Sequence, residues 1–190
     1  MIETYADWVE RVRSAKPLIH HITNYVTVND CANITLGIGA SPIMADALEE
    51  AGDLARVASA LVLNMGTLNE RTIPAMLAAG RAANGAGVPV VFDPVGAGAS
   101  KLRNETAAHL LAEVKLTVLR GNISGVRFLA GLQSSTKGVD ASEGDMRGAD
   151  AEAVAKGLAA KLGCVVAITG AVDVVSDGAR TVCVENGHPM

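Results

Sequence analysis

Residues that could handle a phosphorylated ligand follow the predicted strands of this sequence. The guanidinium of Arg120 can bind phosphate oxygens in a fork, and Asp93 could hold Mg²⁺, usually through water molecules. Glycines beside them let backbone N–H groups approach an anion closely. The full set comprises a carboxylate, a guanidinium, amides, hydroxyls and glycines: Asn24, Gly66, Thr67, Asp93, Gly96, Gly98, Arg120, Asn122, Thr169 and Gly170.

Each of these residues also has a plainer explanation. Asp93-Pro94 is equally typical of a turn, and Arg120 could form an ion pair instead of a phosphate contact. Thr169-Gly170 could be an ordinary strand exit. It is the joint occurrence of such residues after five strands that favours a functional site.

The elements that would position this set alternate along the chain. Continuous apolar runs predict buried strands, and amphipathic or Ala-rich runs between them predict helices. The expected strands are Leu18–Ile22, Ala60–Met65, Val88–Phe92, Leu116–Leu119 and Cys164–Thr169, with a hairpin through Val172–Val175 and Thr181–Val184. The expected helices are Met1–Ser14, Val28–Gly37, Asp46–Ser59, Thr67 to Gly85–Gly87, Arg103–Val114, Asn122–Ala130 and Ala149–Leu162.

Strands that are apolar on both faces and alternate with helices predict a mostly parallel sheet in an α/β fold. In such sheets ligands bind beyond the carboxyl ends of the strands. Thr67-Leu68-Asn69-Glu70 fits a capping box that would open a helix. His20 and His21 would point to opposite faces of a strand, so we expect one in the core and no metal pair.

Composition narrows the class of protein. The length of 190 residues predicts a single domain over 1–190. Because 49% of the residues are apolar but only 3% are aromatic, the core is expected to be aliphatic. A net charge of −4 without a basic run disfavours nucleic-acid binding, and no apolar run is long enough to span a membrane. Three scattered cysteines indicate neither a disulfide framework nor a zinc site, so we expect a cytoplasmic protein.

Two common nucleotide-binding signatures are absent from the sequence. No G-x-x-x-x-G-K-[ST] run occurs, which disfavours a Walker-type kinase. Gly37-Ile38-Gly39 lacks the third glycine of a Rossmann fingerprint and does not open a helix after a strand.

Eight short stretches, in order along nearly the whole chain, resemble hydroxyethylthiazole kinases of thiamine salvage. Any one of them is weak, but eight in order are specific. They are Ile22-Thr23-Asn24, Gly39–Met44, Asn64–Leu68, Asp93–Gly98, Arg120-Gly121-Asn122, Lys137–Asp140, Ile168-Thr169-Gly170 and Asn186-Gly187-His188.

The resemblance implies a ribokinase-like three-layer fold, with ATP as co-substrate and Mg²⁺ as cofactor. The acceptor would be the primary alcohol of 4-methyl-5-(2-hydroxyethyl)thiazole, bound at a subunit interface of a homotrimer. By motif, the thiazole site would be lined by Asn24, Val26, Met44, Gly66 and Thr67. Arg120, Asn122 and Thr169 would bind ATP, and Asp93 would help to place Mg²⁺ through water.

Three departures from the family pattern bear on activity. The family continues after Asn-Gly-His with a catalytic Gly-Thr-Gly-Cys type loop, whereas this sequence ends at Met190, so we expect a C-terminally incomplete domain without a catalytic loop residue. The family's Asn-x-x-Glu has Gly125 in place of Glu, and its Thr-Gly-Glu-x-Asp has Ala171 in place of Glu. Both changes remove a carboxylate near the predicted Mg²⁺ and phosphate site.

Three hypotheses follow. The first is a thiazole kinase that phosphorylates the thiazole alcohol. The second is a family member or fragment that binds the thiazole without phosphoryl transfer, because of Gly125, Ala171 and the missing loop. The third, a kinase for another alcohol such as a sugar or a pyrimidine, fits the Asn24 and Met44 neighbourhoods less well.

Overall fold

The computed structural model describes residues 4–131 and 148–185, and it divides into two compact units. The first unit comprises Met1–Leu63 and Thr67–Val90, and the second comprises Asn64–Gly66 and Val91–Met190. Helices and strands alternate in both units, which confirms the predicted α/β class. The single-domain assignment stays a prediction.

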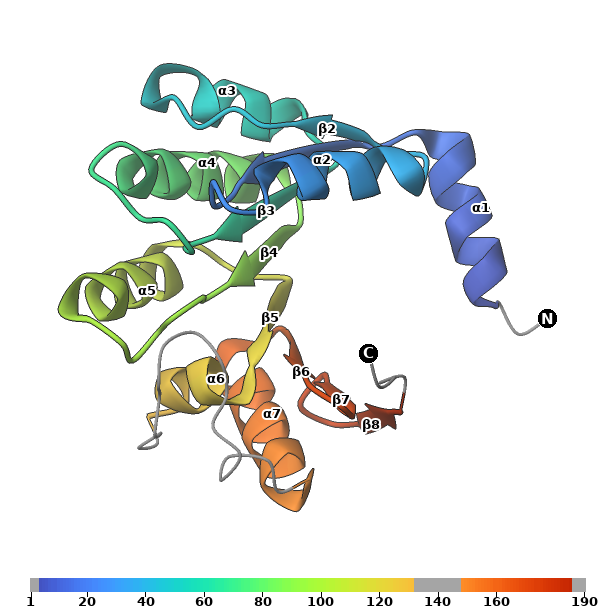
Figure 1. Ribbon diagram of the computed structural model, residues 1–190, viewed down its shortest axis with the longest axis vertical. Coiled ribbons are helices and arrows are strands. Elements are labelled where there is room, and N and C mark those ends of the chain that lie inside the picture. Colours follow the sequence, from blue (N-terminus) through green and yellow to red (C-terminus); the bar gives the residue numbers. More distant parts are fainter. Residues whose placement is uncertain (1–3, 132–147, 186–190) are drawn as a thin grey trace. The chain divides into compact units, whose positions relative to one another are not determined.

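The first unit has a three-stranded parallel sheet and four helices (Figure 1). Strand β1 lies between β2 and β3 and pairs in parallel with both. In chain order the elements are α1 (Tyr5–Ala15), β1 (Leu18–Ile22), α2 (Val28–Gly37), β2 (Ser41–Ile43), α3 (Leu48–Val57), β3 (Ala60–Asn64) and α4 (Thr72–Ala86).

Small residues let two helices of the first unit pack closely. Helices α3 and α4 run side by side (Figure 1), and a Cβ added at Gly52 would lie only 3.7 Å from the Cβ of Ala82. The alanines Ala51, Ala55 and Ala79 are fully buried. The low aromatic content therefore suits a core of short side chains.

The second unit continues with parallel strands and ends in an antiparallel hairpin (Figure 1). Strands β4, β5 and β6 pair in parallel, and β6, β7 and β8 pair antiparallel. The elements are β4 (Val90–Asp93), α5 (Lys101–Glu113), β5 (Val118–Asn122), α6 (Ile123–Leu129), α7 (Gly148–Leu162), β6 (Val165–Thr169), β7 (Asp173–Ser176) and β8 (Thr181–Val184).

The structure corrects the sequence-based boundaries at several points. The capping box predicted at Thr67 is wrong, because α4 begins at Thr72 and the Thr67 hydroxyl instead accepts a hydrogen bond from the Tyr25 N–H. Strand β2 was not predicted, and β5 includes Arg120 and Asn122, which were expected to follow it.

The two adjacent histidines are both buried, whereas one was expected in the core. His20 is 0% and His21 8% exposed. Strand β1 lies between β2 and β3 in a parallel arrangement, and its last three residues, His20, His21 and Ile22, are all buried although their side chains alternate between the two faces. In the described ranges, no helix is long and apolar enough to cross a membrane.

Candidate functional site

Asp93 and Arg120 form an ion pair at the carboxyl ends of two neighbouring strands of the second unit. Their strands, β4 and β5, pair in parallel, with Phe92 opposite Leu119. The Arg120 Nη1 lies 3.1 Å from the Asp93 Oδ2, with Arg120 half exposed and the Asp93 side chain only 16% exposed. The expected gathering of charged groups at this edge is therefore observed, as an ion pair.

Burial makes the ionised form of Asp93 costly. Desolvation raises the pKa of its carboxyl above the usual value of 3.8, and the Arg120 guanidinium and the Asn64 side chain oppose that shift only in part. A carboxylate whose pKa is shifted by desolvation and by one specific charged partner marks a candidate functional site.

Asn122 and Thr169 lie opposite one another on strands β5 and β6. Asn122 caps helix α6, because its Oδ1 accepts a hydrogen bond from the Gly125 N–H at 3.0 Å. The Thr169 hydroxyl donates to the Gly121 carbonyl at 3.4 Å. Asn122 and Thr169, two of the predicted ATP-binding residues, are thus held by hydrogen bonds to backbone groups at or next to the end of β5.

In the first unit, Asn24 organises the turn between β1 and α2. Its Oδ1 accepts hydrogen bonds from the N–H groups of Val26 and Thr27, both at 3.0 Å, and from the Thr27 hydroxyl. The turn presents Val26, which is 81% exposed. Thr67 joins the same turn through its bond to Tyr25. Three of the predicted thiazole residues are therefore brought together.

Met44 follows strand β2 and is half-buried. The following residue, Ala45, is held by a hydrogen bond to the buried His20. The His20 Nε2 lies 2.7 Å from the Ala45 carbonyl oxygen. That bond requires a proton on Nε2, and burial lowers the pKa of His20, so the ring is neutral. His20 was not assigned a role from the sequence, and its adjacency to His21 gave no signal of one.

Gly66 lies in the loop after β3, and two side chains of the second unit hold this loop. Asn64 accepts a hydrogen bond from the Gly66 N–H at 2.9 Å. Arg103 of helix α5 donates to the carbonyls of Met65 and Gly66. Sequence reasoning missed Arg103, since an arginine in the first turn of a helix carries no signal of distant partners.

The residues present fit a Mg²⁺ ion that is held largely by phosphate and water. Mg²⁺ commonly binds one or two carboxylates and keeps several waters, and Asp93 supplies one carboxylate with an oxygen that faces Arg120. Among the described residues, no group of three or more His, Cys, Asp or Glu side chains could form a protein-only metal site.

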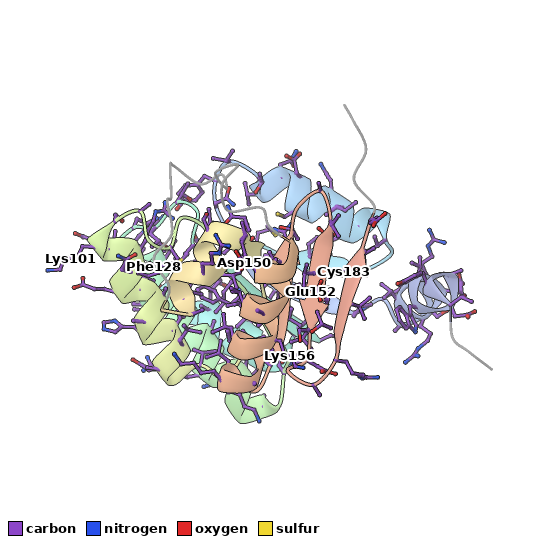
Figure 2. All side chains as sticks on the ribbon, turned by 90° about the horizontal axis from the view of Figure 1, so that it is seen from below. Lys101, Phe128, Asp150, Glu152, Lys156 and Cys183 are labelled. Carbon is purple, nitrogen blue, oxygen red and sulfur yellow. The ribbon has the colours of Figure 1, made fainter. Side chains whose placement is uncertain are left out.

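Two cysteines of the second unit, Cys164 and Cys183, do not offer an activated thiol. Figure 2 shows Cys183 on β8 beside Glu152 of α7. Desolvation is the largest cause that raises the pKa of the Cys183 thiol, and the Glu152 carboxylate raises it further. Burial also raises the pKa of Cys164. Both therefore remain protonated at neutral pH, unlike a nucleophilic cysteine.

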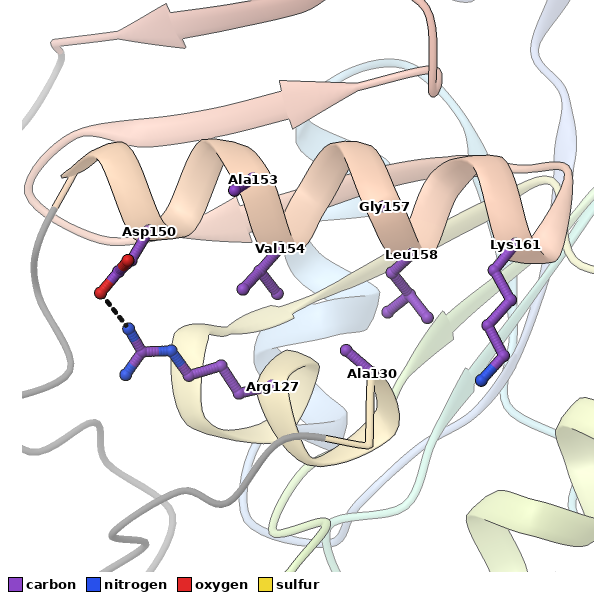
Figure 3. A pocket seen from close by; sticks show the side chains of 8 residues that line it. All are labelled: Arg127, Ala130, Asp150, Ala153, Val154, Gly157, Leu158 and Lys161. Atoms are coloured by element: carbon purple, nitrogen blue, oxygen red, sulfur yellow. Dashed lines mark hydrogen bonds and ion pairs between the residues drawn. The ribbon is translucent and has the colours of Figure 1, made fainter.

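A separate cavity of about 550 Å³ lies between α6 and α7 (Figure 3). Its floor is formed by small and apolar side chains such as Ala153, Val154 and Leu158, and an Arg127–Asp150 ion pair of 3.2 Å closes one end. None of the predicted site residues lines it. We therefore assign the site from the strand ends rather than from this cavity.

Two of the eight motif stretches lie outside the described residues. They are Lys137–Asp140 and Asn186-Gly187-His188. The run Leu132–Gly148 is polar and rich in glycine and has no clear period, which predicts a surface excursion, and it also falls almost entirely outside the described residues.

Comparison with known proteins identifies relatives over nearly the whole chain. The sequence profile of the Hydroxyethylthiazole kinase family matches residues 9–190. The hydroxyethylthiazole kinase of Ruminiclostridium cellulolyticum is 63% identical over 96% of this chain, and that of Clostridium beijerinckii is 62% identical over 96%. The chain spans about two thirds (67%) of the length of these two relatives.

Solved structures agree with this result. The hydroxyethylthiazole kinase protein of Pyrococcus horikoshii OT3 aligns with a TM-score of 0.83 and 42% identity, over 95% of this chain and 66% of that one. Adenosine kinase from Schistosoma mansoni shares the fold alone, with a TM-score of 0.53 at 12% identity. The family and the ribokinase-like fold class predicted from the sequence are confirmed: this chain belongs to the hydroxyethylthiazole kinase family.

Proposed function

We propose that the protein carrying this chain transfers the γ-phosphoryl group of ATP to the primary alcohol of 4-methyl-5-(2-hydroxyethyl)thiazole. The observation that carries this proposal is the Asp93–Arg120 pair at the strand ends, in a chain 63% identical to a hydroxyethylthiazole kinase. The reaction makes an O–P bond to the alcohol, breaks the bond to the β-phosphate and releases ADP and a proton.

Each part of the site has a proposed role. The Asn24 turn, Val26, Met44, Gly66 and Thr67 bind the thiazole, whose small aromatic ring suits a mostly apolar pocket with a few polar anchors. Arg120, Asn122 and Thr169 bind the ATP phosphates. Asp93 holds Mg²⁺ through water, and the ion would neutralise charge on the phosphates when bound.

The pairing of Asp93 with Arg120 supports these roles. A phosphate group arriving at Arg120 offers the half-exposed guanidinium a charge-assisted partner that can be bound in a fork. Asp93 would then hold the hydrated Mg²⁺ ion in place of Arg120. When ATP and Mg²⁺ bind, Arg120 would leave Asp93 for a phosphate group and Asp93 would face the Mg²⁺ ion. Before that, the ion pair keeps both side chains in position.

Two further expectations belong to this proposal. The protein forms a homotrimer with the thiazole site between subunits, and it works in the cytoplasm. The exposed apolar side chains of the first unit support a subunit contact, since Val26, Ile34 and Leu36 are 81%, 65% and 59% exposed on and beside α2. The oligomeric state is measured by light scattering alongside every activity assay.

The test is ester formation by the complete gene product with Mg²⁺, ATP and the thiazole alcohol, detected by mass spectrometry. Thiazole phosphate above a no-enzyme control is the expected result. A folded trimer that binds the thiazole in calorimetry without turnover would instead identify a binding protein. A folded trimer that does neither would exclude both.

A Gly125→Glu variant sharpens this test. The family pattern has Glu at this position, and a Cβ added at Gly125 would meet the Asn122 Oδ1 at 3.4 Å and the Pro94 carbonyl at 3.5 Å, which are ordinary contacts. The backbone surroundings of Gly125 therefore accommodate a Cβ. Higher turnover in Gly125→Glu is expected if the lost carboxylate limits the rate, and unchanged turnover would show that it does not.

A further inference from the structure

One arginine holds two loops of the second unit together. Arg103 lies in the first turn of α5, where Ser100 caps the helix by accepting a hydrogen bond from the Arg103 N–H. Its Nη1 donates to the carbonyls of Met65, at 2.5 Å, and Val95, at 2.6 Å. Its Nη2 donates to the Gly66 carbonyl. A single guanidinium thus bridges the loop after β3 and the loop after β4.

The loop after β4 is built to admit this side chain. Gly96 has a left-handed φ of +71°, and a Cβ added there would lie 3.1 Å from the Arg103 Cδ and 3.3 Å from its Cζ. The guanidinium therefore passes directly over the bare Cα of Gly96. Glycine is required here for both the backbone conformation and the close approach.

Neighbouring bonds extend the same connection. Asn104, the next residue of α5, accepts a hydrogen bond from the Gly98 N–H at 2.8 Å. The Met65 N–H donates to the Asp93 carbonyl at 3.3 Å. The first turn of α5 therefore fixes the segments that carry Gly66 and Asp93.

Arginine is suited to this task because its fork presents several donors in a fixed plane and stays charged. Three backbone carbonyls that face one point repel each other, and a cation between them removes that repulsion. Lysine offers a single ammonium on a flexible stem, so it cannot hold the same three oxygens in one plane.

We propose that Arg103 is a positioning residue, which sets the acceptor loop at Gly66 against the metal loop at Asp93–Gly96. The role in the reaction rests on the proposed function, whereas the clamp itself does not. In this proposal Arg103 makes no contact of its own with the acceptor or the nucleotide, and it is therefore not called catalytic. It acts through the carbonyls of Met65, Gly66 and Val95.

The experiment compares Arg103→Lys, Arg103→Met and Gly96→Ala with the wild-type complete protein. Arg180→Lys is the matched control, because Arg180 lies in the β7–β8 hairpin with its side chain 87% exposed. Amide hydrogen exchange is measured first, without substrate. The amides of Met65, Gly66 and Ala97 should exchange faster in the three test variants, while those of β6–β8 remain unchanged.

Steady-state kinetics then separate positioning from a merely structural role. In Arg103→Lys, the KM for the thiazole alcohol should rise and kcat should fall, by up to about 100-fold, since small misplacements of reacting groups cost that much. The KM for ATP should change less than the KM for the thiazole alcohol, because Arg120, Asn122 and Thr169 lie on β5 and β6, whereas the hydrogen bonds of Arg103 reach the loops after β3 and β4. A protein that only loses stability would keep both KM values in its folded fraction.

The outcomes decide the inference whichever variants fold. Unchanged exchange at Met65, Gly66 and Ala97 in Arg103→Lys would overturn the clamp, as would unaltered kinetics in an active, folded Arg103→Lys protein. If Arg103→Met does not fold, Arg103→Lys and Gly96→Ala carry the test. Failure of the proposed function is distinguishable, because it would appear as an inactive wild type while the exchange result still reports on the clamp.

Discussion

The two regions that carry the predicted site residues are built on opposite principles. Around Asn24, in the first unit, an uncharged amide oxygen collects donors from its own turn, and Val26 is left 81% exposed. Around Asp93, in the second unit, a carboxylate is buried against a half-exposed arginine at an energetic cost. The first region is relaxed before any ligand arrives, whereas the second holds a charge that a metal or a phosphate would relieve.

This difference fits the ligands proposed for each region. A neutral thiazole needs shape, apolar contact and a few fixed polar groups. A nucleotide phosphate and its metal need charge that is already in place, because preorganised electrostatics lowers the barrier of phosphoryl transfer. The contrast therefore predicts that substitutions in the two regions will affect stability and turnover differently.

The largest effect is expected at Asp93. Asp93→Asn removes the buried charge, so turnover should fall by about 100- to 1,000-fold, the usual cost of losing an electrostatic group at a reacting centre. Thermal stability should stay equal or rise, because the desolvation that raises the pKa of Asp93 disappears. Steady-state kinetics and a melting curve measure both quantities.

The control for that change is Asp53→Asn, since Asp53 is 80% exposed on α3 and lies outside the site. Its turnover should equal that of the wild type. A clear loss of stability in Asp93→Asn, with turnover retained, would mean that the Asp93–Arg120 pair is structural and that the contrast between the regions is wrong.

A smaller effect, of the opposite kind, is expected at Asn24. Asn24→Ala leaves the N–H groups of Val26 and Thr27 without their acceptor, which should cost about 1–2 kcal/mol of folding stability. Asn24→Asp retains an acceptor oxygen and should restore most of the loss. Chemical denaturation measures the stabilities, and calorimetry measures thiazole binding. Equal stability of Asn24→Ala and wild type would refute the capping role.

The sequence was sufficient to predict the edge at which the charged residues gather. The carboxyl ends of parallel strands share one edge, so Asp93, Arg120 and Thr169 were expected at the same edge. The structure alone shows which strands are neighbours, and therefore that Asp93 lies beside Arg120 and that Asn122 lies opposite Thr169. Local pattern and sheet geometry were enough to predict the edge but not these pairs.

Contacts between distant segments could not be predicted in this way. The Thr67 hydroxyl was expected to cap a helix, but it is taken by the N–H of Tyr25, 42 residues earlier. Arg103 reaches a carbonyl 38 residues earlier. Neither partner is visible in the residues adjacent in sequence, because side chains of this kind are positioned by packing rather than by local propensity.

The smallest effect is the pH dependence of stability, and the two regions should differ in its sign. Burial lowers the pKa of His20 and of His21 below the usual value of 6.5, and the neighbouring His20 lowers that of His21 further. As pH falls below 6.5, the unfolded chain binds protons that the folded first unit does not. Stability is therefore lost through the window between 6.5 and the lowered values.

Asp93 contributes the opposite sign at lower pH. Its pKa is raised above 3.8 in the fold, so between the raised value and 3.8 the folded chain binds a proton that the unfolded chain does not. This single group thus adds stability as pH falls through that window. Asp93→Asn should remove the gain and leave the loss due to the histidines in place.

Denaturant midpoints of wild type, Asp93→Asn and His109→Gln between pH 8 and pH 4 measure both contributions. His109 is an exposed histidine of α5, so its substitution controls for the titration of histidine at the surface. The wild type and His109→Gln should lose stability together below pH 6.5. A stability that does not change below pH 6.5 would show that His20 and His21 accept protons inside the fold. We expect such protonation to be costly, because both rings are buried and the His20 ring is bonded to the Ala45 carbonyl.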